Sequence, residues 1–313
     1  MHVLVAGGAG FIGSHLCDRL LAKGHRVLCV DNLKTGRRAN LRQAAADPRF
    51  TLIRADVRRA LRLPKTDFVF HLASYASPPY YQTWSVDTML TNAVGTHRLL
   101  EHARRHGAGF LLASTSEVYG DPLTHPQREG DWGNVNPVGV RACYDEAKRF
   151  AEALTMEYVR KHGLDARIAR IFNTYGPRLQ KDDGRVISNF IHQALAGRPL
   201  TLYGTGRQTR SFCYVSDMVE GLLRVAFRRG KRGEIVSLGK SREVSMQEAA
   251  RLVCRLCGRP LRTVHRPLPG DDPQRRRPDI RRVRRELGWE PRVSLETGLA
   301  RTIAWFRDDT AAT

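Results

Sequence analysis

A tyrosine and a lysine four residues apart form a chemically suggestive pair. Tyr144 and Lys148 stand at positions i and i+4 of a predicted helix, so their side chains share one face of it. An ammonium group beside a phenol favours the phenolate, so we expect Lys148 to lower the pKa of Tyr144. The pair therefore predicts a general base that acts on a hydroxyl group, although an ordinary exposed helix pair would have the same spacing.

The stretch Ser114-Thr115-Ser116-Glu117 adds polar groups that such a base would need nearby. It ends a buried apolar run, and the carboxyl end of a parallel strand is where ligands bind in open α/β sheets. Thr115 is placed to hydrogen-bond the hydroxyl group that Tyr144 deprotonates. Glu117 brings a carboxylate to the same edge, unless it is only a solvated loop residue.

Glycines cluster directly after the first apolar run. Gly7, Gly10 and Gly13 precede or open a predicted helix that includes Phe11 and Ile12. Such glycines let the backbone approach a pyrophosphate, and the helix N-terminus supplies free N–H groups. Asp31 ends the next apolar run, where an acid binds ribose hydroxyls and repels a 2′-phosphate. The sequence thus predicts NAD as cofactor, with NADP the weaker alternative.

Short apolar runs alternate with longer helical patterns in the first half of the chain. We expect strands at 2–6, 26–31, 50–54, 67–72, 110–114 and 166–172, and helices at 12–23, 86–106 and 142–162. This alternation predicts βαβ units, and hence an α/β fold with a Rossmann-type doubly wound parallel sheet.

The pattern changes after Pro177, where elements become shorter and prolines more frequent. We expect helices at 186–196, 216–229, 245–257, 279–287 and 295–307. Residues 1–176 are therefore predicted to form the dinucleotide-binding domain. Residues 177–313 are predicted to form mainly a smaller C-terminal α/β lobe, with some segments returning to pack on the first domain.

These residues carry a family resemblance. The glycine turn, Thr115 and the Tyr144/Lys148 pair resemble those of the extended short-chain dehydrogenase/reductase family that acts on nucleotide sugars. Further motifs are similar to one subgroup, the UDP-glucuronate decarboxylases or UDP-xylose synthases: 71–74 (HLAS), 111–122 (LLASTSEVYGDP), 141–146 (RACYDE), 169–174 (ARIFNT), 208–212 (QTRSF) and 271–280 (DDPQRRRPDI). Departures are small, with Tyr80 where the family usually has Asn and Arg277 where Lys is common.

The resemblance implies a NAD-dependent decarboxylation of UDP-glucuronate to UDP-xylose. C4 is oxidised, the resulting 4-keto acid loses CO₂, C5 is protonated, and hydride returns to C4. The implied catalytic residues are Thr115, Glu117, Tyr144, Lys148 and Arg276. Arg276 is chosen among three successive arginines by the family pattern, and it would assist C5 protonation through water.

The resemblance and the fold together give two further sets of expected contacts. The cofactor set is Gly7, Gly10, Phe11, Ile12, Gly13, Asp31, Asn32, Asp56, Val57, Leu72, Ala73, Tyr144 and Lys148. The substrate set, mostly in the second lobe, is Tyr81, Glu117, Asn173, Arg185, Tyr203, Gln208, Arg210 and Arg276. The arginines and Asn173 are expected at the diphosphate, and Tyr203 and Gln208 beside the uracil.

Other reactions of the family remain alternatives. A 4,6-dehydratase carries Thr-Asp-Glu, whose Asp protonates the departing hydroxyl group, whereas Ser116 stands there in this chain. A 4-epimerase needs no glutamate at position 117. Release of a UDP-4-keto-pentose, or action on another nucleotide sugar, is a further possibility. A binding or regulatory protein on the same fold is least favoured, because the catalytic set is complete.

The basic composition first suggests nucleic acid as a partner. The net charge is +21 and the pI about 10.5 in 313 residues. However, the arginine-rich stretch 275–285 contains no aromatic residue for base stacking, and its later arginines fall on the solvated face of a predicted helix. We therefore expect a UDP-sugar rather than nucleic acid as the partner.

Assembly and location rest on weaker signals. The two long helices resemble those of the family's dimer interface, and Phe150, Leu154 and Tyr158 form an apolar stripe that faces either a second copy or the sheet. We expect a homodimer. No apolar run is long enough to span a membrane, and the six cysteines suit a reducing compartment, so a cytoplasmic location follows. Cys254 and Cys257 lack further ligands at zinc spacing, so no metal site is predicted.

Overall fold

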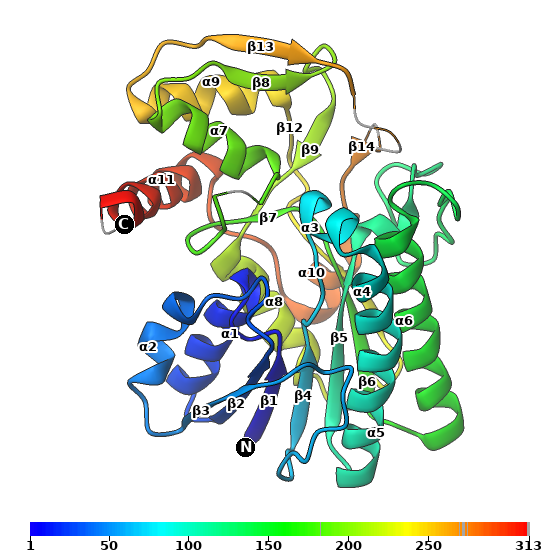
Figure 1. The fold of residues 1–313 in the computed structure, drawn as a ribbon. Helices are drawn as coiled ribbons and strands as arrows, with labels where there is room; N and C mark the ends of the chain where they lie inside the picture. The colour runs from blue at the N-terminus through cyan, green and yellow to red at the C-terminus, as the bar shows by residue number, and fades with distance from the viewer. Residues whose placement is uncertain (182, 269, 271–272, 274, 312–313) are drawn as a thin grey trace.

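A seven-stranded parallel sheet organises the larger part of the molecule (Figure 1). The computed structural model describes residues 1–313 except 182, 269, 271–272, 274 and 312–313. The strand order is β11 (Ile235–Leu238), β6 (Ala166–Ile171), β5 (Gly109–Thr115), β4 (Phe68–His71), β1 (His2–Ala6), β2 (Arg26–Asp31) and β3 (Phe50–Arg54). The order reverses between β1 and β4, so the predicted doubly wound Rossmann-type sheet is confirmed.

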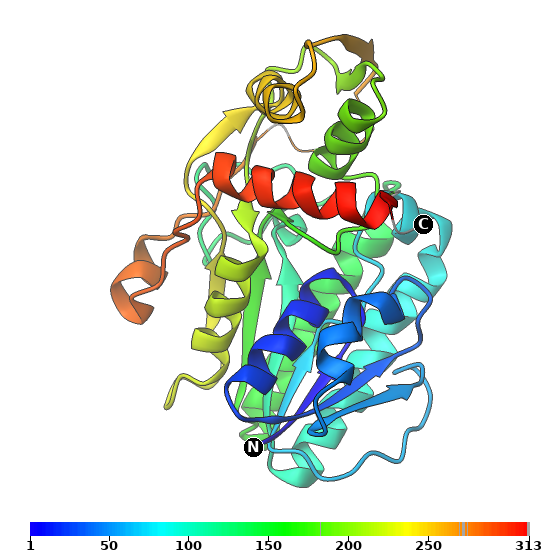
Figure 2. The same ribbon diagram turned by 90° about the vertical axis from the view of Figure 1, so that its left-hand side faces the viewer.

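Both faces of this sheet are covered, which explains why its strands are apolar throughout. Val3 and Val5 of β1 pack in one core with α1 (Phe11–Ala22) and α8 (Val215–Ala226). Leu4 and Ala6 point the other way, into a second core with α5 (Thr96–His106) and α6 (Ala142–His162). Figure 2 shows the sheet from the side, with the short α2 (Arg42–Ala45) beside α1.

The predicted helix at 86–106 is not a single regular helix. It consists of α4 (Ser85–Leu90), one π-helical segment η2 (Thr91–Gly95) and α5. A Cβ on Gly95 would lie 2.8 Å from Cγ2 of Val57, so the wide turn sits tightly against the loop after β3. Sequence periodicity does not reveal a π-turn, which often accompanies a functional site.

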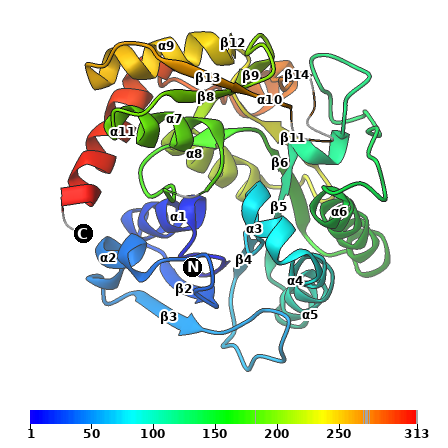
Figure 3. The same cartoon turned by 45° about the horizontal axis from the view of Figure 1, so that its top comes forward.

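Small sheets and three helices build the second lobe (Figure 3). The helices are α7 (Val186–Leu195), α9 (Met246–Cys257) and α11 (Leu295–Ala311). The strand pairings are β8 (Leu200–Tyr203) with β13 (Thr263–Arg266), β7 (Thr174–Tyr175) with β10 (Cys213–Tyr214), and β9 (Thr209–Ser211) between β12 (Glu243–Ser245) and β14 (Arg275–Arg276). Most of these strands have two to four residues, too few to leave a periodic signal in the sequence.

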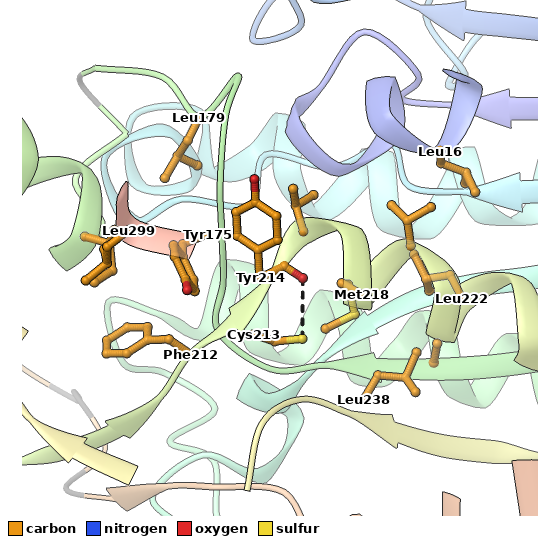
Figure 4. Packing of buried hydrophobic residues seen from close by; sticks show 14 of the residues in the cluster. Leu16, Tyr175, Leu179, Phe212, Cys213, Tyr214, Met218, Leu222, Leu238 and Leu299 are labelled. Atoms are coloured by element: carbon orange, nitrogen blue, oxygen red, sulfur yellow. Dashed lines mark hydrogen bonds between the residues drawn. The ribbon is translucent and has the colours of Figure 1, made fainter. Parts of the chain in front are cut away.

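The two parts share one continuous hydrophobic core (Figure 4). Tyr175, Phe212 and Leu299 from the lobe cluster with Met218 of α8, and Leu238 of β11 lies in the same cluster. Both α8 and β11 come after residue 177 and return to the sheet. The chain therefore crosses between the two parts several times, while the boundary at residue 176 stays a prediction.

The arginine-rich segment forms the short helix α10 (Arg281–Leu287). Val283 is buried, whereas Arg281, Arg284 and Arg285 are exposed and each lies beside a carboxylate. This is the solvated face that the spacing predicts. The segment just before it, 271–280, falls partly outside the described residues.

The described residues show neither a membrane-spanning helix nor a cluster of metal ligands. No helix within them has the length and hydropathy to cross a membrane. The same residues contain no group of three or more His, Cys, Asp or Glu side chains that could hold a metal ion. Cys254 and Cys257 are buried, unbonded thiols on α9.

Candidate active site

Three adjoining cavities follow the carboxyl ends of β1, β4 and β5. The first, central cavity is lined by Gly7, Thr115, Tyr144 and Lys148. It shares Gly10, Leu72 and Ser74 with a second cavity beside β2. It shares Glu117, Asn173, Arg185 and Arg276 with a third cavity that extends into the small lobe. One elongated ligand in the second cavity and another in the third cavity would therefore meet at the central cavity.

The glycine turn holds β1, α1 and β4 close together. Gly7 has φ +82°, and a Cβ there would lie 2.6 Å from the backbone nitrogen of Ala73. A Cβ on Gly13 would lie 2.2 Å from the carbonyl oxygen of Gly7. Only glycine fits these two positions, so the start of α1, with Phe11 and Ile12, opens directly on the central cavity.

An acidic group marks the far end of the second cavity. Asp31 accepts hydrogen bonds from the backbone N–H groups of Ala9 at 2.9 Å and Leu33 at 2.8 Å. The cavity is also lined by Asn32, Asp56, Val57, Leu72 and Ala73, all of them in the expected cofactor set. Arg58 holds the pKa of Asp56 down to about 2, mainly through hydrogen bonds. A carboxylate at the end of β2 and a glycine cradle at β1 together fit a dinucleotide.

Tyr144, Lys148 and Thr115 meet in the central cavity. Lys148 lies over the Tyr144 ring, with Nζ 6.0 Å from the ring centroid, and donates a 2.8 Å hydrogen bond to the carbonyl oxygen of Ala113. Tyr144 is hydrogen-bonded to Thr115. The helix α6 and the end of β5 thus bring the expected base and its partner to one point.

The predicted direction of the Tyr144 pKa is wrong for the protein without ligands. Burial, followed by the negative charge of Glu117, raises the pKa of Tyr144, although the bond to Thr115 opposes this. Burial also lowers the pKa of Lys148 to about 7, so its positive charge at neutral pH is only partial. Spacing identified the pair, but desolvation decides its charge state.

Glu117 lies between two arginines. Its Oε2 forms a salt bridge with Nη2 of Arg141, and its Oε1 lies 3.4 Å from Nη1 of Arg276. All three side chains are buried. Burial alone would raise the pKa of Glu117, but the two positive charges outweigh it and hold the pKa at about 2. Nη2 of Arg276 has no hydrogen-bond partner among the described residues, which leaves a buried donor beside the cavity.

The other expected substrate residues line the third cavity with different contacts. Nδ2 of Asn173 is buried without a hydrogen-bond partner in the described part of the chain. Arg185 is paired with both carboxylate oxygens of Asp183, and Nη2 of Arg210 donates to the carbonyl oxygen of Pro273 at 2.6 Å. Tyr203 and Gln208 lie together at the outer end, with Gln208 bonded to the Tyr203 carbonyl.

Tyr81 is not a lining residue of these three cavities. Its side chain is fully buried, and its ring stacks on that of Tyr144 with centroids 5.0 Å apart and planes 4° from parallel. It therefore supports Tyr144 from behind. The helix α3 (Pro78–Thr83) that carries it is too short to show in the sequence pattern which face is buried.

Sequence reasoning missed several residues at the site. Arg141 belongs to the motif 141–146, but nothing in the sequence indicates that its side chain contacts Glu117. Gln180 lines the central cavity and links the two parts, because its amide donates to the Thr35 carbonyl and accepts from Tyr80. Ordinary polar residues on loops carry no such signal.

The family model of the NAD dependent epimerase/dehydratase family matches residues 3–239. The chain belongs to this family. NAD is accordingly the cofactor of this epimerase/dehydratase chain, and the glycine cradle and Asp31 fit it.

Individual relatives show which members of the epimerase/dehydratase family this chain is similar to. The chain is 52% identical over 307 residues to UDP-glucuronic acid decarboxylase 2 of Arabidopsis thaliana, which covers 98% of this chain and 68% of the relative. It is 51% identical over 307 residues to UDP-glucuronic acid decarboxylase 1 of Xenopus tropicalis, covering 98% and 72%. The subgroup resemblance seen in the motifs is thereby confirmed.

Solved structures of this epimerase/dehydratase family share the fold. A UDP-glucose 4-epimerase from Thermotoga maritima, solved with UDP-glucose, has a TM-score of 0.90 at 30% identity, covering 99% of this chain and 100% of that one. A dTDP-glucose 4,6-dehydratase from Streptomyces venezuelae, solved with NAD bound, has a TM-score of 0.89 at 31% identity, covering 100% and 98%.

Proposed function

We propose that this protein is a NAD-dependent UDP-glucuronate decarboxylase that forms UDP-xylose. The observation that carries the proposal is the buried Arg276–Glu117 pair beside Tyr144, in a chain about half identical to UDP-glucuronic acid decarboxylases over 98% of its length. The Arg276 guanidinium offers positive charge to a carboxylate in the cavity where the Tyr144 hydroxyl also lies.

The first step takes place at O4 of the sugar. Tyr144 and Thr115 hold this hydroxyl between them, and Tyr144 removes its proton as the bond to carbon becomes a carbonyl. NAD⁺, held at the glycine turn and Asp31, would supply the acceptor for the hydride of C4 and its later return. Lys148, whose pKa of about 7 keeps part of its charge at neutral pH, supports the phenolate electrostatically.

The second step is loss of CO₂. Oxidation at C4 makes a β-keto acid, so the bond from C5 to the carboxylate carbon can break with its electrons passing to O4. Tyr144 and Thr115 stabilise the enolate oxygen by hydrogen bonding. The free Nη2 donor of Arg276 orients the carboxylate before it leaves.

The third step returns a proton to C5. An arginine is a poor proton donor because its pKa is far above neutral, so we assign Arg276 the task of positioning a water molecule and the carboxylate. Glu117 completes this site. In the outer cavity, Asn173, Arg185 and Arg210 are proposed to hold the diphosphate, and Tyr203 and Gln208 to flank the uracil.

Ser116 is the feature that argues against a 4,6-dehydratase. A dehydratase must protonate a leaving hydroxyl at C6, and a serine hydroxyl is too weak an acid for that task. Ser116 lines the central cavity beside Glu117. The local chemistry therefore favours departure of CO₂ over departure of water.

The deciding experiment is incubation of the NAD-loaded protein with UDP-glucuronate. We expect CO₂ and a UDP-pentose with the mass of UDP-xylose, with no net consumption of NAD⁺. A product two hydrogens lighter would indicate release of the 4-keto-pentose. Unchanged UDP-glucuronate would contradict the proposal.

We also propose that the protein is a cytoplasmic homodimer. Val86 is 68% exposed, and Met89 and Leu90 on the same helix and Phe150 on α6 are also exposed. The helices α4 and α6 pack side by side, so these side chains form an apolar face that a second copy would cover. Six unbonded cysteines are consistent with a reducing compartment.

A further inference from the structure

The proposed reaction consumes one proton in each turnover. The C5–carboxylate bond breaks to give CO₂ and an enolate, and the enolate must take up H⁺ at C5 before hydride returns to C4. Because Tyr144 returns its own proton to O4 when the ketone is reduced, the C5 proton must come from another source. Arg276 holds its protons too tightly to supply it.

A second buried carboxyl group lies directly behind Glu117. Asp145 follows Tyr144 on α6, is 6% exposed, and lies close enough to Glu117 for the charge of Glu117 to act on it. Its Oδ1 has no hydrogen-bond partner among the described residues. Two carboxylates buried near each other repel, so one of the two carboxyl groups tends to hold a proton.

The two carboxyl groups face different cavities. Glu117 lines the central cavity with Tyr144, whereas Asp145 lines a separate cavity on the other side. That outer cavity is formed with Arg141 and the loop residues Gly120, Asp121, Asn134, Val135 and Asn136. The pair is thus a bridge between the site of chemistry and a second opening.

We propose that Asp145 passes protons from this outer cavity to Glu117, which delivers them, through a water molecule held by Arg276, to C5 of the substrate. Asp145 loses H⁺ to the Glu117 carboxylate, Glu117 loses it to the enolate carbon through that water, and solvent in the outer cavity reprotonates Asp145. Asp145 touches neither substrate nor cofactor, so it is a positioning residue that acts through Glu117. The inference rests on the proposed function.

The surrounding charges place the proton on Asp145 at neutral pH. Burial, and then the negative charge of Glu117, raise the pKa of Asp145 to about 8, while Arg141 and Arg276 oppose this rise. The groups that act on the pair from the neighbouring elements are Tyr81 of α3, Arg141, Cys143 and Tyr144 of the α6 start, Arg185 before α7, and Arg276 of β14. Asp121 is the other carboxyl group among the described residues that line the outer cavity.

The first test measures the proton itself, without substrate. Infrared difference spectra should show the carbonyl stretch of a protonated carboxyl group that disappears as pH rises through about 8. The band should be absent from Asp145→Asn and unchanged in Glu146→Gln, a neighbouring carboxylate on α6 that faces Arg149 instead. A wild-type spectrum with no such band would overturn the inference, even if the enzyme releases CO₂ normally.

The second test measures where turnover stops. In single turnovers, Asp145→Asn should still release CO₂, but decay of the bound-NADH absorbance should slow by about 10²-fold, the scale of general acid catalysis. In the wild type this decay should slow as pH rises through about 8, and in Asp145→Asn it should be independent of pH. Asp145→Glu should restore the pH dependence.

A merely structural role gives a different result. In that case Asp145→Asn would lower the rates of oxidation and NADH decay alike and would keep the wild-type pH profile. If Asp145→Asn does not fold, the wild-type pH profile and the Asp145→Glu variant still decide the matter. Failure of the wild type to release CO₂ would contradict the proposed function instead, and the infrared result would stand apart from it.

Discussion

Arg276 and Glu117 lie 159 residues apart in the chain, yet Nη1 of Arg276 is 3.4 Å from Oε1 of Glu117. Glu117 follows β5 of the large sheet, and Arg276 belongs to β14 of the small lobe. The contact exists only because the two parts pack on one core. The chemistry at the substrate carboxylate therefore depends on how the small lobe packs against the large sheet.

Replacing Arg276 should impair decarboxylation more than oxidation. In Arg276→Ala, bound-NADH absorbance should still rise on adding UDP-glucuronate, while CO₂ release falls by about 10²-fold or more, the cost of losing one charged donor at a developing charge. Arg275→Ala is the matched control, since that neighbour is exposed and lines none of the three cavities. Equal CO₂ release in both variants would remove Arg276 from the mechanism.

Tyr144→Phe should abolish C4 oxidation. The variant keeps the ring that stacks on Tyr81 but loses the hydroxyl that takes the substrate proton, so no bound-NADH absorbance should appear. The expected loss in rate is about 10²- to 10⁴-fold. Tyr158→Phe, on the same helix, is the control, because its hydroxyl bonds Glu101 away from the cavities. Wild-type turnover in Tyr144→Phe would eliminate this base.

Asp31 should set the preference for NAD over NADP. Asp31→Ser removes the carboxylate that binds ribose hydroxyls and repels a 2′-phosphate, so the ratio of the two Kd values should shift toward NADP by about tenfold or more. Calorimetric titration with each dinucleotide measures it. Asp47→Asn is the control, because the half-buried ion pair of Asp47 with Arg49 involves no lining residue of the cofactor cavity, so the ratio should stay unchanged. An unchanged ratio in Asp31→Ser would assign selectivity to other residues.

Lys148 should make the stability of the cofactor-free protein rise with pH. Burial lowers its pKa to about 7 from the ordinary value of 10.5, so between these values the unfolded chain binds a proton that the folded chain lacks. Stability therefore increases as pH rises from about 7 to 10.5, by at most a few kcal/mol (about 1.4 kcal/mol per unit). Urea unfolding at several pH values measures this slope.

The contribution of Lys148 to the pH dependence of the free energy of unfolding can be separated from that of other groups. Lys148→Met should flatten the rise in free energy of unfolding above pH 7, whatever its effect on stability at a single pH. Lys161→Met, near the exposed end of α6, should keep the wild-type slope. If Lys148→Met and the wild type have the same slope, Lys148 is charged in the folded protein.

The exposed face of α4 and α6 should hold two copies together. Phe150→Glu places a charge in this face, so light scattering after size exclusion should show a shift from dimer to monomer. Leu123→Glu is the control, because Leu123 is more exposed than Phe150 but lies on a loop and not on either helix. A wild-type protein that is monomeric at micromolar concentration would contradict the proposed dimer.

The apolar stripe on α6 shows why a dimer could not be inferred from helical spacing alone. Phe150, Leu154 and Tyr158 share helical spacing, but Tyr158 is buried in the core with α5 while Phe150 is half exposed. Helical periodicity reports an apolar face, and the 21-residue helix α6 packs on β5 and β6 and also on α4 and α5. Only packing tells them apart.

The sequence by itself determined strands β1 to β6 of the large sheet, the glycine turn and the pairing of Tyr144 with Lys148, but not the edge strand β11. These depend on local signals, namely apolar runs, helical spacing and backbone space that only glycine leaves free. The tertiary structure alone decided the charge states and the buried cluster of Glu117, Arg141, Asp145 and Arg276. Desolvation and Coulomb interactions act through space between residues that the chain order separates, so no pattern of residue types records them.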